Sequence, residues 1–133
     1  MRHPSSRDAE RVRSVLVVDD SGYTRARIRD QLSSLGFRVV EADDGDSAIA
    51  AFVKHRPLVI VIDHVMRGLS GIDASRALLT RDPGARIILL TAVNDDGLRQ
   101  QAISAGVLEV LSKSDVGRLS SVVSELMDES FNG

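Results

Sequence analysis

The chain has 133 residues, enough for one domain with a substantial core, and its 43% hydrophobic and 27% charged residues are typical of globular proteins. A net charge of −2 and 3% aromatic residues give no case for binding nucleic acid or an anionic membrane. The absence of cysteine excludes disulfides and thiolate metal sites. No apolar run approaches the roughly 18 residues of a membrane span, and the start lacks a signal-peptide core, so we expect a cytoplasmic protein.

Five apolar runs alternate with five segments that carry helical signals. The apolar runs predict strands at 15–18, 37–40, 58–63, 86–91 and 107–111. Helices are predicted at about 23–35, between the turn 41–46 and Pro57, between the loop 64–71 and the "DPG" turn, at 94–106, and from about Asp115. Residues 1–13 are polar and are predicted to form a flexible tail, which leaves residues 14–130 as the single domain.

Two of the predicted helices carry clear apolar stripes. The first has Ile28, Leu32 and Leu35 on one face, with Gly36 as its stop. The last has a stripe that fits a core-facing side better than a dimer interface: Val116, Leu119, Val123 and Leu126.

Strands that are apolar on both faces belong in a parallel sheet with helices on both sides. Four of the five predicted strands end in polar residues: Asp19 and Asp20 after the first, Asp63 after the third, Thr91 after the fourth and Lys113 after the fifth. Ligands of such sheets bind at the carboxyl ends of the strands, where the strand order reverses. The second strand contributes no such residue and is therefore placed at an edge. The predicted fold class is α/β, a doubly wound five-stranded parallel sheet of order 2-1-3-4-5.

Three carboxylates that converge on one rim repel one another unless a cation lies between them. Oxygen ligands of this kind suit Mg²⁺. On the other side, the Thr91 hydroxyl and the Lys113 ammonium would hold a phosphoryl group. One carboxylate would then be the nucleophile and form an aspartyl phosphate. Asp63 is the best candidate, because it ends the central strand between the other two acids and Lys113.

Each of these residues alone has a simpler explanation. The acids of the first strand could cap a helix, Asp63 could belong to a turn, Thr91 could cap the fourth helix, and a lone lysine is usually a surface charge. The ordered set at four strand ends is what indicates phosphoryl chemistry. Other polar residues are interpreted as solvated or packed: His55 and His64, and the helix face of Arg25, Arg27 and Arg29.

The ordered set resembles the receiver domain of bacterial two-component response regulators over about residues 14–127. The resemblance implies a flavodoxin-like (βα)5 fold and a signalling switch that catalyses only its own phosphotransfer and dephosphorylation. The phosphoryl donor would be a histidine kinase or a histidine phosphotransfer protein. The downstream protein is unknown, and a homodimer is a further possibility.

The resemblance also implies a role for each site residue. The metal ligands of Mg²⁺ would be Asp19, Asp20, Asp63 and the backbone carbonyl of Val65. Asp63 would be the phosphoacceptor, and Thr91 and Lys113 would contact the phosphoryl group. Further matches lie in the loops: Met66 and Gly71 after the acceptor, and the small Ala92 after the threonine.

Three positions depart from the family pattern. Arg67 and Ser114 stand where the family usually has proline, in the loop after the acceptor and after the lysine. Val110 stands where the family has an aromatic switch residue. A valine has no ring to swing between two positions, which puts the usual output readout in question. By resemblance, Val65 and Val93 also flank the path of a hydrolytic water, which predicts a long-lived aspartyl phosphate.

Three other functions compete with a phosphorylated switch. A docking module that ignores phosphate is favoured by the lost aromatic and prolines and opposed by the intact acids, threonine and lysine. A phosphohydrolase similar to the haloacid dehalogenases would need a second acid two residues after its nucleophile, where Val65 follows Asp63 and Ser21 follows Asp19. A nucleotide-binding fold would need a glycine-rich loop after the first strand, which is absent.

Overall fold

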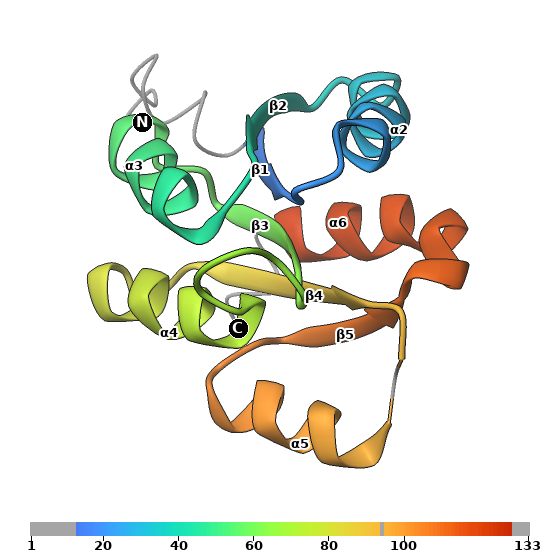
Figure 1. Cartoon of the computed structure of the whole chain (residues 1–133). Helices are drawn as coiled ribbons and strands as arrows, with labels where there is room; N and C mark the ends of the chain where they lie inside the picture. Colours follow the sequence, from blue (N-terminus) through green and yellow to red (C-terminus); the bar gives the residue numbers. More distant parts are fainter. Residues whose placement is uncertain (1–12, 94, 129–133) are drawn as a thin grey trace.

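A five-stranded parallel sheet lies between two layers of helices in the computed structural model, which describes residues 13–93 and 95–128 (Figure 1). The strand order is β2-β1-β3-β4-β5, as predicted. The strands are β1 (Ser14–Val18), β2 (Arg38–Ala42), β3 (Val59–Asp63), β4 (Arg86–Thr91) and β5 (Glu109–Ser112). The helices are α2 (Gly22–Ser33), α3 (Gly45–His55), α4 (Gly71–Arg81), α5 (Asp96–Ser104) and α6 (Leu119–Met127), with a 3₁₀ helix η1 (Lys113–Arg118) before α6.

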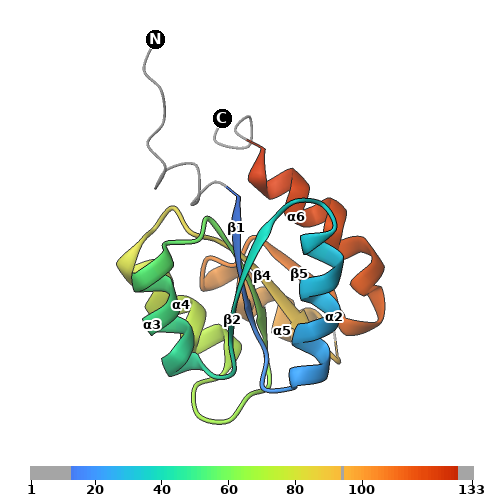
Figure 2. The same ribbon diagram turned by 90° about the horizontal axis from the view of Figure 1, so that it is seen from above.

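Each face of the sheet has its own hydrophobic core. Helices α3, α4 and α5 cover one face, and α2 and α6 cover the other (Figures 1 and 2). Successive strand residues point to opposite faces, so Leu16 and Val18 pack under α3 while Val15 and Val17 pack under α2 and α6. Burial on both faces explains why these strands read as continuous apolar runs.

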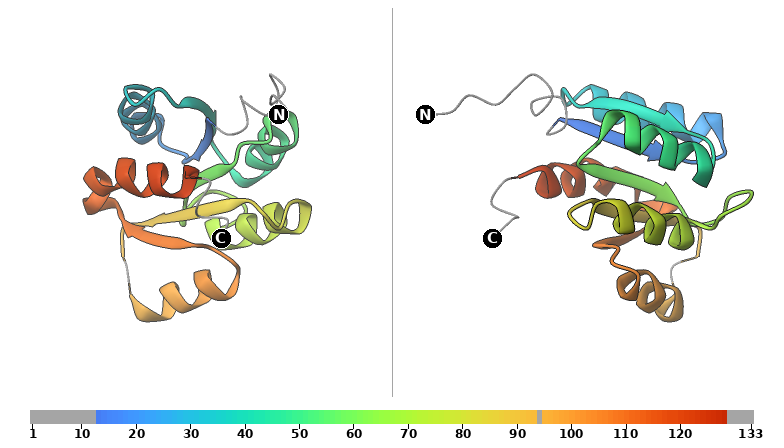
Figure 3. Two further views of the ribbon diagram at one scale, coloured as in Figure 1. Left: turned by 180° about the vertical axis from the view of Figure 1, so that it is seen from behind. Right: turned by 90° about the vertical axis from the view of Figure 1, so that its left-hand side faces the viewer.

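Most turns at the carboxyl end of the sheet are short, and four of the helices that follow begin with a side-chain cap. Each cap accepts a hydrogen bond from a backbone N–H three residues further on, and the caps are Ser21, Asp44, Ser70 and Asp95. The loop between β3 and α4 is the exception, and Figure 3 (right) shows it projecting beyond the end of the sheet. The strand ends are therefore held close to the starts of the helices that follow them.

Several predicted boundaries were wrong. Helix α2 ends at Ser33, so Leu35 lies outside it and is 47% exposed, and strand β2 runs two residues further than predicted. The last helix begins at Leu119 rather than at about Asp115, because the preceding segment is 3₁₀ and Asp115 has non-helical angles (φ −103°, ψ 26°). Val116 therefore belongs to η1. The rest of that stripe is buried in the core, as expected, and offers no exposed dimer surface: Leu119, Val123 and Leu126.

The predictions for the chain ends lie mostly outside the described residues, which do not include 1–12 or 129–133. Arg13, the last residue of the predicted tail, stacks 5.5 Å from the ring centre of Phe37 and donates to the Gly36 carbonyl at 3.0 Å. None of the helices within residues 13–93 and 95–128 has the length and hydrophobicity that a membrane span requires.

Candidate functional site

The ends of β1 and β3 bring three carboxylates together. The two strands are adjacent, with Val18 opposite Ile62, so Asp19 and Asp63 follow side by side. One carboxylate oxygen from each of Asp19, Asp20 and Asp63 lies within 4.8 Å of the other two. The Asp19 and Asp63 side chains are buried, and Asp20 is exposed. The site therefore has two buried acids, Asp19 and Asp63, and one that is exposed to solvent, Asp20.

Lys113 is the cation that faces these acids. It follows β5, and its side chain reaches past the end of β4 to place Nζ 3.1 Å from Oδ2 of Asp63 and 3.3 Å from Oδ2 of Asp19. Partial burial lowers the pKa of Lys113, but the hydrogen bond and charge of Asp63 and the charge of Asp19 outweigh it, so the pKa is raised overall. The ammonium is therefore charged at neutral pH.

The pKa of Asp63 is raised above its ordinary value. Burial is the main cause, and the charge of Asp19 adds to it. The hydrogen bond from Lys113 and the backbone N–H of Val65 act in the opposite direction without cancelling the rise. Lys113 pairs with two of the three clustered carboxylates, so this one ammonium does not balance their combined negative charge.

The two oxygens of the Asp19 carboxylate have different surroundings. Oδ1 accepts the backbone N–H of Ser21 at 2.8 Å. Oδ2 is buried, and no group among the described residues donates a well-aligned hydrogen bond to it, the nearest cation being Lys113. A buried carboxylate oxygen without a well-aligned donor, beside two more carboxylates, fits a hard divalent cation such as Mg²⁺, which prefers oxygen ligands. The Val65 backbone N–H hydrogen-bonds Asp63, and a carbonyl ligand from Val65 stays a prediction.

Thr91 lies where predicted, at the buried end of β4, but its hydroxyl is occupied by its own loop. It donates to the Val93 carbonyl at 2.9 Å and accepts the Val93 N–H at 3.2 Å. Strand β4 pairs with β3 and β5, so Thr91 lies between Asp63 and Lys113 in the strand order. The hydroxyl would have to rotate away from Val93 to contact a group on Asp63.

The turn that presents Lys113 depends on a residue that the sequence reasoning missed. The Ser112 hydroxyl accepts the Ser114 N–H at 3.2 Å and hydrogen-bonds the Ser114 hydroxyl at 2.8 Å. Ser112 thereby caps η1 through the N–H of Ser114, the residue that stands where the family pattern has a proline. No cis peptide bond occurs in the described residues. The sequence contained a signal for this cap, because a serine side chain often accepts a hydrogen bond from the backbone N–H two residues further along the chain.

Gly71 allows the loop after β3 to return close to the acceptor strand. A Cβ at this position would lie 2.3 Å from the Asp63 carbonyl oxygen and 2.8 Å from the His64 Cα, so only glycine fits. The Gly71 N–H donates to the His64 carbonyl at 2.8 Å, and Met66 packs against the core. The loop is therefore fastened on both sides of its exposed tip.

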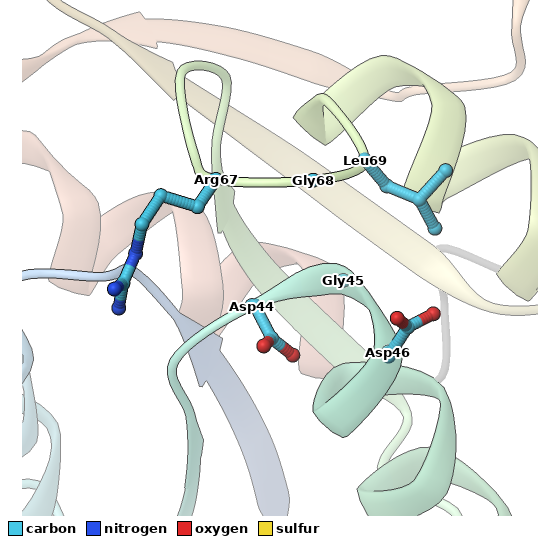
Figure 4. Close-up of a pocket in the computed structure, with 6 residues that line it drawn as sticks. All are labelled: Asp44, Gly45, Asp46, Arg67, Gly68 and Leu69. Carbon is cyan, nitrogen blue, oxygen red and sulfur yellow. The ribbon is translucent and has the colours of Figure 1, made fainter.

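Arg67 lies at the tip of this loop and lines a shallow pocket next to the start of α3 (Figure 4). The other lining residues are Asp44, Gly45, Asp46, Gly68 and Leu69. The pKa of Asp44 is lowered, first by the Ser47 backbone N–H and also by the charge of Arg67. Because none of the three clustered acids lines this pocket, it is separate from the acid site.

Val110 is buried in the core on the α5 side of the sheet. Its carbonyl accepts a hydrogen bond from Nη2 of Arg99, on α5, at 3.4 Å. The position of the family's aromatic switch is thus taken by a buried core residue.

Comparisons with known proteins agree with this geometry. Residues 15–124 match the family model of the response regulator receiver domain. Chemotaxis protein CheY of Thermotoga maritima is 31% identical over 100 residues, which are 74% of this chain and 83% of that protein. The solved structure of Vibrio cholerae CheY4 has a TM-score of 0.81 at 27% identity, covering 85% of this chain and 97% of that one.

A chain of the CheX–CheY–BeF3–Mg²⁺ complex from Borrelia burgdorferi has a TM-score of 0.75 at 26% identity, with 82% of this chain and 87% of that one covered. The strand order, the acid cluster and the family match over most of the chain agree with one another. The chain belongs to the receiver domains of two-component response regulators, the phosphoryl-accepting switches of these signalling systems.

Proposed function

We propose that this receiver accepts a phosphoryl group on Asp63 from a histidine kinase or a histidine phosphotransfer protein. The observation that carries the proposal is the position of the Asp63 carboxylate. It ends the central strand, buried, with the Lys113 ammonium 3.1 Å away and two further carboxylates beside it. An ionised carboxylate held between positive charge and a metal-binding cluster is suited to attack phosphorus.

In the proposed reaction, a carboxylate oxygen of Asp63 forms a bond to phosphorus as the bond from phosphorus to the donor's histidine nitrogen breaks. Lys113, already within hydrogen-bond distance of Asp63, would donate to a phosphoryl oxygen and offset its charge. The Thr91 hydroxyl would leave Val93 and donate to a second phosphoryl oxygen. The catalysis of self-phosphorylation is thus positioning and charge neutralisation.

We propose Asp19, Asp20, Asp63 and the Val65 carbonyl as the Mg²⁺ ligands. Bound there, Mg²⁺ would neutralise the carboxylates and the phosphoryl oxygens. The buried Oδ2 of Asp19, which accepts no well-aligned hydrogen bond from the described residues, supports this assignment. So does the Borrelia burgdorferi complex, whose CheY was crystallised with Mg²⁺ and BeF3, a mimic of the phosphoryl group.

Intact-mass spectrometry tests the proposal. The chain is incubated with acetyl phosphate and Mg²⁺, and we expect its mass to increase by one phosphoryl group. In a parallel incubation with EDTA in place of Mg²⁺, we expect no adduct to form. Asp63→Asn, which keeps the side-chain size, should gain none. A phosphoryl adduct at the wild-type level in Asp63→Asn would overturn the assignment. An unmodified wild type that nevertheless binds a partner would favour the phosphate-insensitive docking module.

A further inference from the structure

We infer that Arg25 is a positioning residue that sets the geometry of the acid pair for metal binding and phosphorylation. The inference rests on the proposed function of the Asp63 site. Nη1 of Arg25 donates to the backbone carbonyl of Asp19 at 2.6 Å, while Nε pairs with Oε1 of Glu41 at 3.2 Å. One side chain on α2 therefore connects the end of β1 to the edge strand β2.

The Asp19 carbonyl lies just beyond the last hydrogen bond that joins this end of β1 to β2. The last hydrogen bond from this end of β1 to β2 runs from the Asp19 N–H to the Ala42 carbonyl, at 3.1 Å. Beyond it, the peptide that joins Asp19 to Asp20 is held by Arg25. A peptide is a planar unit, so fixing its carbonyl also fixes the direction in which Asp20 leaves the strand. Arg25 thereby controls where the exposed acid lies relative to the two buried ones.

Arg25 acts here through geometry rather than through its charge. Glu41 pairs with Arg25 and also with Nη1 of Arg29, at 3.1 Å, so the acidic side chain offsets the nearby positive charge. The Arg25 side chain is 21% exposed, against 43% for Arg29. The sequence interpretation of this helix face as simply solvated was therefore wrong for Arg25.

Arg29 provides a matched control, because among the described residues it pairs with Glu41 and Asp30 and not with the acid pair. We compare Arg25→Met and Arg29→Met, which keep a long unbranched side chain and remove the charge. Mg²⁺ affinity is measured by titration calorimetry, phosphorylation by acetyl phosphate, and stability by thermal melting. We expect Arg25→Met to bind Mg²⁺ about 10- to 100-fold more weakly, as is usual when a group that orients a metal ligand is lost. Arg29→Met should keep the wild-type affinity.

A measurement on the metal-free protein distinguishes a positioning role of Arg25 from a general effect on stability. In the metal-free protein, the Asp20 amide should exchange with solvent faster in Arg25→Met and at the wild-type rate in Arg29→Met. If both variants lower the melting temperature alike and leave Mg²⁺ affinity and Asp20 exchange unchanged, the role is merely structural and the inference is overturned.

Should Arg25→Met fail to fold, Glu41→Gln is compared with Arg29→Met instead. Both variants break the Arg29–Glu41 ion pair, but only Glu41→Gln also loosens Arg25. We expect weaker Mg²⁺ binding in Glu41→Gln alone, and equal affinities would overturn the inference. If the wild type binds Mg²⁺ and takes up phosphate while these variants behave as wild type, only the role of Arg25 fails. If the wild type does neither, the proposed function itself fails.

Discussion

The ammonium of Lys113 lies 3.1 Å from Oδ2 of Asp63 and joins the end of β5 to the end of β3, across the intervening β4. It also approaches Asp19, so a single side chain faces two of the three acids. In the metal-free site this is the positive charge that offsets the buried carboxylates. After phosphorylation the same ammonium is placed to hold the new phosphoryl group.

Replacing Lys113 should separate metal binding from phosphotransfer. We expect Lys113→Ala to slow phosphorylation by acetyl phosphate roughly 100-fold, the usual effect of losing one donor to a developing negative charge. Mg²⁺ affinity should be kept or increased, because a repelling cation has been removed. Phosphorylation rates at saturating Mg²⁺ and a metal titration measure the two effects. A variant that phosphorylates at the wild-type rate would show that Lys113 only pairs with the acids.

Mg²⁺ should stabilise the fold. The metal binds the folded cluster and relieves its self-repulsion, so the melting temperature should rise with Mg²⁺ concentration. At 100 times the dissociation constant the gain in the free energy of unfolding is about 2.7 kcal/mol. Melting curves at constant ionic strength measure it, with Asp20→Ala as the variant that should respond less. A melting temperature independent of Mg²⁺ would mean that the acids bind no metal.

The raised pKa of Asp63 predicts how stability depends on pH in the absence of metal. A group whose pKa is higher in the folded state favours folding while it is protonated. Its contribution is complete below the unfolded value of about 3.9 and is lost as the pH rises through the folded value. The asparagine of Asp63→Asn stays neutral at every pH. The free energy of unfolding of this variant, relative to that of wild type, should therefore increase as the pH rises from the unfolded pKa of Asp63 through its raised folded pKa. Urea unfolding in EDTA from about pH 3 to about pH 7 tests this; a difference that is constant with pH would contradict it.

The aspartyl phosphate should be long-lived. Val65 and Val93 are 74% and 67% exposed, and by resemblance to the family they would flank the hydrolytic water, to which neither side chain can offer a hydrogen bond. We expect Val65→Asn combined with Val93→Glu to speed loss of phosphate about tenfold, which needs only about 1.4 kcal/mol of barrier. Phosphate loss is followed after removal of the donor, with Ile103→Asn as an exposed-residue control. A double variant no faster than wild type would exclude water access as the determinant.

Much of the fold and the identity of the clustered acids could be predicted because both follow from local pattern. Strands that are apolar on both faces imply a covered parallel sheet, and polar residues at consecutive strand ends must meet at one edge. Asp19, Asp63 and Lys113 lie together for this reason alone.

The orientation of individual side chains could not be predicted, because it depends on tertiary partners. The Thr91 hydroxyl bonds to its own loop, a choice of rotamer that residue type does not determine. Arg25 and Arg29 look equivalent on the helix, and only the position of the Asp19 carbonyl distinguishes them. The start of α6 was misplaced because the Ser112 cap and the Asp115 kink shape the segment before it.

The identity of the phosphoacceptor can be measured by site mapping. After phosphorylation in Mg²⁺, borohydride reduction converts an aspartyl phosphate to homoserine, and the modified residue is located by peptide mass spectrometry. We expect homoserine at position 63 and none at the neighbouring acids Asp19 and Asp20. Homoserine at either of those positions, or elsewhere in the chain with Asp63 unmodified, would contradict the assignment of Asp63 as the phosphoacceptor.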